Sequence, residues 1–322
     1  MPVTVEPGGG LEYHQLQRGG RSGWGWTALG VVSLVVLTLV VAPTVLLAVF
    51  LIGYAVHGTP LSDAVDQLSD TSHVTPATLA YINAGLAAAI PIAMLVSWLV
   101  HGLRPRWLAS VRPRIRWRWL LTCFGLAAVT LVVTVLVANL LPAQGDTADM
   151  SGSANHFTSE TRDFLLVILF LTPLQAAGEE YAFRGYLTQA FGGLLRSRVA
   201  AVVLPAFLFA LAHGGQDVPI FFDRFAFGLV AGVLVIVTGG LEAGIAMHVL
   251  NNFLAFGVAL AYGDISSTLN VTSGSWWNVP VTLTQSLVYL GLATLVARRR
   301  GLATRTAAPA GRADFVEGVG RL

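Results

Sequence analysis

Long apolar runs separated by short polar connections dominate this chain. Most of these runs approach the roughly 20 residues that a helix needs to cross the hydrocarbon core of a bilayer. The runs cover residues 26–54, 79–98, 119–141, 164 onward, 199–212, 225–240, 243–262 and 279–297. Segments in lipid must be helical, because lipid offers no partner for free backbone groups. The pattern predicts an all-α, polytopic membrane protein with about eight transmembrane helices.

The charges in the connections predict how the chain is oriented. Arginines precede the first run, fill the loop at 104–118 and follow the last run at 298–300, whereas the alternate connections carry aspartates such as Asp63 and Asp149. Arginine-rich loops remain on the cytoplasmic side of a membrane. We therefore expect an integral protein of a bacterial plasma membrane, with both the N and the C terminus in the cytoplasm.

The hydropathy pattern also predicts four regions. Residues 1–25 and 301–322 are rich in Gly, Ala and Arg, and we expect them to be disordered cytoplasmic tails. Residues 26–160 are expected to form the N-terminal transmembrane helices. Residues 161–300 are expected to form a transmembrane core that carries the chemistry, because the polar residues within apolar runs concentrate there.

Composition agrees with a membrane setting. The 322 residues are 55% hydrophobic and 11% charged, whereas a soluble protein carries roughly 25% charged residues. The net charge of +2 and the lack of a basic stripe with interleaved aromatics argue against a nucleic-acid partner. The expected partners are the lipid bilayer and a peptide or protein substrate.

The polar pair Glu179 and Glu180, followed by Arg184, stands inside one of the apolar runs. Ionisable groups at membrane depth are costly and usually mark function. On a helix, Glu180 and Arg184 lie four residues apart on one face and can neutralise each other. Glu179 is rotated by about 100° from that pair, which leaves its carboxylate available for chemistry.

Further polar residues follow in the later apolar runs. His213 comes four residues after Phe209, and His248 stands one helical turn before Asn252 on the same helix face. Taken singly, a membrane histidine often bonds a backbone carbonyl, and an asparagine often joins two helices. Together with a spare glutamate, they can supply a general base, its partner and hydrogen-bond donors for an oxyanion.

These three motifs, Glu-Glu-x-x-x-Arg, Phe-x-x-x-His and His-x-x-x-Asn, resemble in order and spacing those of the CPBP family of intramembrane proteases. That family includes CAAX prenyl endopeptidases of the Rce1 type, bacterial Abi proteins and lysostaphin-resistance-like proteins. The resemblance covers roughly residues 164–261. It implies an intramembrane endopeptidase that hydrolyses peptide bonds of membrane-associated substrates with a glutamate-activated water.

The resemblance also implies a role for each residue. Glu179 would activate the water with help from His213, while His248 and Asn252 would stabilise the oxyanion. Glu180, Arg184 and Phe209 would give structural support.

A zinc mechanism remains an alternative within the same class. Two histidines and a glutamate form a legitimate catalytic zinc set, which here would be Glu179, His213 and His248. No His-Glu-x-x-His helix is present in the sequence, and the resemblance favours a mechanism without a cofactor.

Two other classes of function also stay open. A non-catalytic scaffold or immunity protein could keep the same cavity, and intramembrane Glu, His and Arg residues also build the proton relays of transporters. The two halves of the sequence show no inverted repeat, which argues against a transporter.

Overall fold

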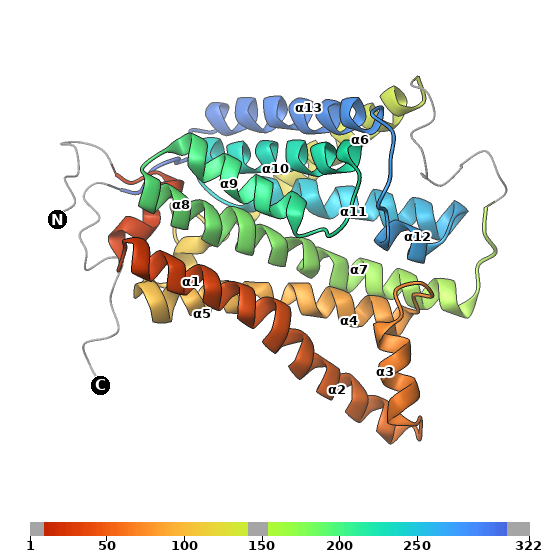
Figure 1. Cartoon of the computed structure of the whole chain (residues 1–322). Coiled ribbons are helices and arrows are strands. Elements are labelled where there is room, and N and C mark those ends of the chain that lie inside the picture. Colours follow the sequence, from red (N-terminus) through yellow and green to blue (C-terminus); the bar gives the residue numbers. More distant parts are fainter. Residues whose placement is uncertain (1–9, 141–153, 308–322) are drawn as a thin grey trace.

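Helices account for the regular structure of this chain (Figure 1). The computed structural model describes residues 10–140 and 154–307. Within these ranges no β-strand occurs, and the only strand-like pairings are two isolated bridges, Glu12 with Arg305 and Ser110 with Gly240. The predicted all-α fold is confirmed.

The elements follow one another with short connections. The first half contains η1 (Tyr13–Gly19), α1 (Trp24–Val36), η2 (Leu37–Val41), α2 (Ala42–Val56), α3 (Leu61–Ser69), α4 (Pro76–Ala87), α5 (Ala89–His101), η3 (Pro105–Leu108) and α6 (Trp117–Ala138). The second half contains α7 (Ser159–Glu179), η4 (Glu180–Leu187), α8 (Thr188–Leu195), α9 (Arg198–Leu211), α10 (Val218–Thr238), α11 (Glu242–Tyr262), α12 (Ile265–Leu269) and α13 (Asn278–Arg299).

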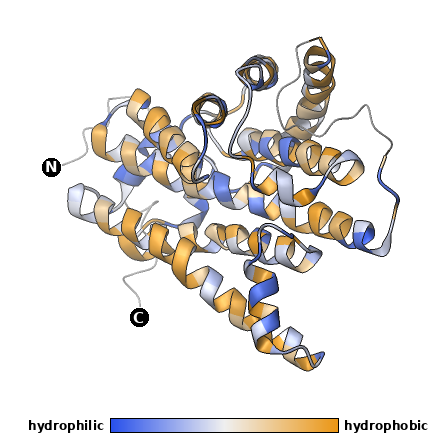
Figure 2. Ribbon diagram, turned by 45° about the vertical axis from the view of Figure 1, so that its right-hand side comes forward, coloured by the Kyte–Doolittle hydropathy of each residue, from blue (hydrophilic) through white to orange (hydrophobic). Residues whose placement is uncertain are grey.

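Seven helical spans in the described residues are long and apolar enough to cross a membrane, which indicates an integral membrane protein. They are Trp24–Val56, Pro76–His101, Trp117–Ala138, Ser159–Leu195, Val218–Thr238, Glu242–Tyr262 and Asn278–Arg299. The eighth apolar run forms α9, whose 14 residues extend only about 21 Å at 1.5 Å per residue. Figure 2 shows hydrophobic residues along most of the length of these helices.

The boundaries of several helices follow from polar residues that precede the apolar runs. The side chains of Thr75, Thr158, Ser197 and Asp217 each accept a hydrogen bond from a backbone N–H in the first turn of the helix that they precede. These bonds satisfy donors that a helix start leaves without an intrahelical acceptor. The caps begin α4, α7, α9 and α10, of which α7 carries Glu179 and α9 carries Phe209.

The long span formed by α7, η4 and α8 passes through the middle of the bundle (Figure 1). It packs against α4 and α5 on one side and against α9 and α11 on the other. Half of the most apolar window of α11 is buried, compared with 6% of the corresponding window in the first span. The helices that carry the three motifs are therefore central, and the first span lies at the periphery with its apolar side chains outward.

One end of the bundle gathers the arginine-rich connections. Backbone bonds join the loop before α6 to the turn between α10 and α11, from Val111 N to Gly239 O and from Leu241 N to Ala109 O. The described N-terminal and C-terminal segments meet at the same end, whereas α3, with its aspartates, lies at the opposite end (Figure 1). We call the first of these the arginine-rich end. This segregation agrees with the charge pattern of the loops.

The structure corrects the prediction of disordered tails where it describes them. Residues 13–19 form the 3-10 helix η1, in which Tyr13 and Leu16 are fully buried. The backbones of Leu11 and Thr306 bond to each other, and the Glu12 carboxylate bonds both Arg198 and Arg305. Composition gave no sign of this order, because it arises from pairing between the two ends of the chain. Residues 1–9 and 308–322 lie outside the described residues.

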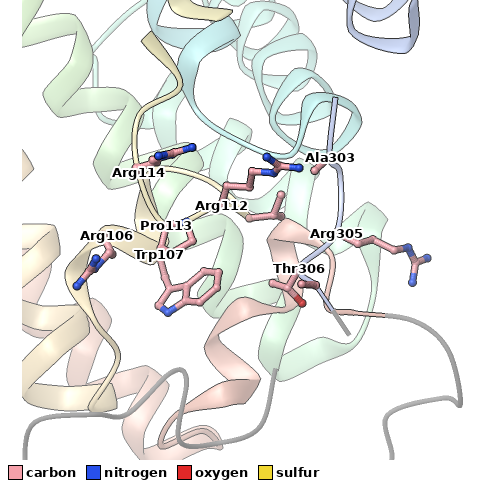
Figure 3. A pocket seen from close by; sticks show the side chains of 10 residues that line it. Arg106, Trp107, Arg112, Pro113, Arg114, Ala303, Arg305 and Thr306 are labelled. Carbon is pink, nitrogen blue, oxygen red and sulfur yellow. The ribbon is translucent and has the colours of Figure 1, made fainter. Parts of the chain in front are cut away.

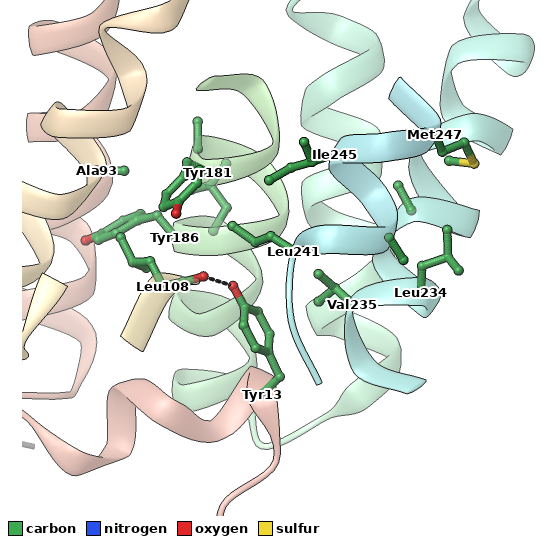
Figure 4. Close-up of a cluster of buried hydrophobic side chains, with 14 of the residues drawn as sticks. Tyr13, Ala93, Leu108, Tyr181, Tyr186, Leu234, Val235, Leu241, Ile245 and Met247 are labelled. Atoms are coloured by element: carbon green, nitrogen blue, oxygen red, sulfur yellow. Dashed lines mark hydrogen bonds between the residues drawn. The ribbon is translucent and has the colours of Figure 1, made fainter. Parts of the chain in front are cut away.

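Tyr13 shows how the N-terminal segment is held in the core. Its hydroxyl donates to the carbonyl of Leu108, and its ring joins a cluster that includes Tyr186 and Leu241 (Figure 4). A Cβ on Gly192 of α8 would lie 2.4 Å from the His14 carbonyl oxygen, so only glycine permits this close approach. The segment therefore packs directly onto the helix that continues from the Glu179–Glu180 motif.

Candidate active site

The Glu179–Glu180 motif lies where the helix geometry changes. The α-helix α7 ends at Glu179, and a π-helical stretch, η4, begins at Glu180 and continues to Leu187. Such stretches are rare and often occur at functional sites. The wider turn does not separate Glu180 from Arg184, whose Nη1 lies 3.2 Å from Glu180 Oε1. The predicted pairing of these two residues is confirmed.

Both members of this ion pair are buried and surrounded by aromatic rings. The side chains of Glu180 and Arg184 are 0% and 1% exposed. The guanidinium carbon of Arg184 lies 4.1 Å from the ring centroid of Phe209, which is a cation–π arrangement. Phe209 therefore contacts the arginine of the ion pair directly.

Glycine makes the room that the Glu180 carboxylate needs. A Cβ built on Gly244 would lie 2.6 Å from Glu180 Oε2. This glycine on α11 therefore allows the helix to approach the carboxylate closely. The other carboxylate oxygen of Glu180, Oε1, meets both Arg184 and His248.

Glu179 differs from Glu180 in exposure and in partners. Its side chain is 12% exposed, whereas that of Glu180 is fully buried. Glu179 Oε1 accepts a hydrogen bond of 2.8 Å from Gln175 Nε2, and its Oε2 lies 3.4 Å from His248 Nε2. Of the two neighbouring carboxylates, Glu180 forms the ion pair with the buried arginine and Glu179 does not.

His248 bridges the two glutamates. Its Nδ1 lies 3.0 Å from Glu180 Oε1, and its Nε2 faces Glu179. A neutral imidazole that donates from Nδ1 presents a lone pair at Nε2, which would face the lone pairs of a charged Glu179. With a proton on Nε2, the ring would instead donate to Glu179. This chain of contacts, from Arg184 through Glu180 and His248 to Glu179, is suited to holding and moving one proton.

Asn252 joins the site through Gln175. Its Nδ2 donates to Gln175 Oε1 over 2.9 Å, and the amide nitrogen of the same glutamine donates to Glu179. The predicted placement of His248 and Asn252 on one face of α11 agrees with these contacts. Asn252 therefore reaches Glu179 through one intervening side chain.

His213 takes a different position from the other three predicted catalytic residues. It follows the end of α9, is exposed, and its Nδ1 lies 2.7 Å from the carbonyl oxygen of Phe209. Its ring packs edge-on against Phe209, with centroids 4.6 Å apart, and Phe209 in turn contacts His248. Glu179 and His248 both contribute to the electrostatic environment of His213. His248 Nε2 lies 3.4 Å from Glu179 Oε2, whereas the contacts of His213 are with Phe209.

The zinc alternative requires Glu179, His213 and His248 to converge. Among the described residues, no three His, Cys, Asp or Glu side chains are grouped closely enough to hold a metal ion. His213 bonds a backbone carbonyl through Nδ1, which leaves Nε2 as the nitrogen that a metal would take. Zinc dependence stays a prediction for experiment, and no reaction step is routed through a metal.

Two residues that contact the site were not predicted from the sequence. Gln175 lies one helical turn before Glu179, and an amide within an apolar run is a sequence signal that could have identified it. Gly244 gave no such signal, because its importance comes from the approach of α11 to Glu180.

Comparisons with known proteins bear on the same segment. Residues 161–254 match the family model described as type II CAAX prenyl endopeptidase Rce1-like. The chain is also 29% identical over 195 residues to the uncharacterised protein YyaK of Bacillus subtilis (strain 168), and this alignment covers 57% of the chain and 64% of YyaK. No solved structure matches the chain.

The matched segment contains every residue of the candidate site, from Gln175 to Asn252. The motif resemblance pointed to a family with several groups of proteins. The matching family model is that of the Rce1-like group. The resemblance predicted from the three motifs is thereby confirmed: residues 161–254 of this helical chain, which has seven membrane-length apolar helical spans in its described part, match the Rce1-like family model.

Proposed function

We propose that this protein is an intramembrane endopeptidase that hydrolyses peptide bonds in membrane-associated proteins or peptides. The observation that carries the proposal is the contact network in which Glu179 meets Gln175 and His248 while Glu180 is paired with Arg184. The Rce1-like match over residues 161–254 supports the same class of reaction.

In the proposed reaction, the Glu179 carboxylate accepts a proton from a water molecule as the water oxygen attacks the substrate carbonyl carbon. The carbonyl π electrons move to the oxygen, which becomes an oxyanion. As the tetrahedral intermediate collapses, the carbon–nitrogen bond breaks and the proton held by Glu179 passes to the leaving amine. No other reactant is needed.

The neighbours of Glu179 supply the remaining functions. His248, held by the Glu180 carboxylate, can share the proton of Glu179 and donate to the oxyanion from Nε2. Asn252 and His213 lie further out, one joined to Gln175 and the other packed against Phe209. We assign Asn252 to stabilising the oxyanion and His213 to assisting Glu179 in activating the water.

The proposal is tested by comparing Glu179→Gln with the wild-type protein in cells, with new peptide termini measured across the membrane proteome. The substitution removes the base but keeps the shape, so termini produced by the wild type should disappear. Glu160→Gln is a matched control, because this exposed glutamate stands in the first turn of the same helix and should leave cleavage unchanged.

A substrate found in this way is then supplied to purified protein in proteoliposomes. The Glu179→Gln variant should cleave it at least about 100-fold more slowly than wild type. Equal cleavage by both forms would reject the proposed base, and the absence of any wild-type-dependent terminus would favour a non-catalytic binding role. Treatment with a strong chelator in this assay should leave activity intact.

A further inference from the structure

The arginine-rich end carries a surface feature that the candidate active site does not use. Two adjoining grooves, of about 580 and 780 Å³, open beside the loop that precedes α6. Both grooves are lined by Arg112 and Arg114 and by Ala303 of the C-terminal segment. Figure 3 shows the two arginines projecting from one loop, with Ala303 beside Arg112.

The arginines of this region fall into two groups. Arg116 is committed to the fold, since its guanidinium bonds the fully buried carboxylate of Glu242 at 2.6 and 2.8 Å. Arg112, Arg114 and Arg118 are exposed, and in the part of the chain that the structure describes no acidic side chain pairs with them. The larger groove is therefore lined by several arginines that no acidic side chain of the described residues neutralises.

Two further features of the larger groove suit an anionic ligand. Arg300 enters its lining from the end of α13 and bonds the Thr122 hydroxyl of α6 at 2.7 Å, which keeps its guanidinium at the groove. The buried indole N–H of Trp119, also in the lining, has no acceptor among the described residues. An oxygen-rich anion would supply acceptors to both kinds of donor.

The groove also lies where a lipid would place such an anion. It is at the ends of α6 and α13, two membrane spans that pack against each other. Trp117 at the start of α6 is 69% exposed, as expected for an aromatic residue at the headgroup level. Further along the same two helices, Leu121 and Leu295 are exposed and offer an apolar surface for an acyl chain.

We propose that this groove is a binding site for the phosphate headgroup of an anionic phospholipid, with Arg112, Arg118 and Arg300 as its charged ligands. A free phosphate shares the charge but not the apolar chain, and the exposed leucines next to the groove favour the lipid. The site is separate from Glu179 and His248 and does not depend on the proposed protease activity.

The test measures the melting temperature of the purified full-length protein in a neutral detergent while lipid is added. A ligand that binds the folded state raises this temperature in a saturable way. Phosphatidylglycerol should raise it, whereas phosphatidylcholine and inorganic phosphate at equal concentration should not. The triple variant Arg112→Gln/Arg118→Gln/Arg300→Gln should bind about 100-fold more weakly, since each arginine near an anionic headgroup contributes about 1 kcal/mol.

A charge-matched control separates a site from general attraction. The variant Arg196→Gln/Arg298→Gln/Arg299→Gln removes three exposed positive charges that do not line the groove. It should retain the response to phosphatidylglycerol within about tenfold in half-saturating concentration. If both triple variants lost the response to phosphatidylglycerol equally, the lipid would be held by diffuse charge attraction and not by a site. An equal response to phosphatidylcholine, or to inorganic phosphate alone, would overturn the assignment to an anionic lipid.

Discussion

At the residue scale, the side chain of Gln175 links two parts of the site that the sequence presents as separate motifs. Its nitrogen donates to Glu179 and its oxygen accepts from Asn252, so one amide orients both. Such a bond sets where the carboxylate points without taking part in the bond changes of the reaction. Gln175 is therefore a positioning residue in the proposed mechanism.

This role predicts the effect of Gln175→Leu, which keeps the side-chain size but removes both hydrogen bonds. Cleavage of an identified substrate should slow by about 100-fold, because a small misplacement of a catalytic group has effects of that size. Asn252→Ala should add little in the Gln175→Leu background, since residues in one network are not additive. Independent, multiplicative effects on the rate constant would contradict the shared network.

At the element scale, α11 approaches η4 so closely that Gly244 faces the buried carboxylate of Glu180. The contact brings His248, four residues further along α11, between the two glutamates. The contacts of His248 with the two glutamates therefore depend on the short distance between α11 and η4.

Gly244→Ala tests this packing. The added methyl group would lie 2.6 Å from Glu180 Oε2 and must displace it or move the helix. Overpacking of this kind costs about 1 to 3 kcal/mol, so the melting temperature and the cleavage rate should both fall. Gly257→Ala on the same helix is the control, because no atom lies within 4 Å of its added Cβ. The packing argument fails if Gly244→Ala melts at the same temperature as Gly257→Ala.

At the scale of the whole molecule, the described N-terminal and C-terminal segments are joined through Glu12. Its carboxylate contacts Arg198 at the start of α9, Arg305 of the C-terminal segment and His14. Burial acts to raise the pKa of Glu12, but the two arginines outweigh it and lower this pKa below its usual value of 4.5. Burial lowers the pKa of His14 to about 4.

These shifts predict a stability that falls as the solution becomes acidic. Between pH 6.5 and about 4, the unfolded chain binds a proton at His14 that the folded chain does not, so the free energy of unfolding decreases. Protonation of Glu12 removes its contribution as the pH falls further, below 4.5. The melting temperature should therefore drop between pH 7 and pH 4.

His14→Gln should flatten that part of the profile, and the exposed His73 provides the control as His73→Gln. The assignment to His14 would be wrong if both variants kept the wild-type dependence of melting temperature on pH.

The orientation of the molecule gives a further prediction. If the arginine-rich end faces the cytoplasm, a cysteine at position 114 should resist a membrane-impermeant thiol reagent in intact cells. A cysteine at position 63, at the opposite end, should react. The native Cys123 is buried and should give little background. Labelling at position 114 from outside the cell, with no labelling at position 63, would show that the protein has the opposite orientation.

The sequence by itself determined the features that depend on local properties. The length of an apolar run decides whether a helix can span a bilayer, and seven of the eight predicted runs form such spans. The pairing of Glu180 with Arg184 also followed from spacing, because residues four apart share a helix face. The three motifs likewise located the segment that matches the Rce1-like family.

Only the tertiary structure decided which groups meet across helices. That His248 contacts Glu179 depends on how α11 is rotated against the span formed by α7 and η4. The order of the N-terminal segment arises from contacts with residues as far away as Thr306, which no local composition records. Helix rotation and long-range pairing are set by packing in three dimensions, and a hydropathy pattern carries information about neither.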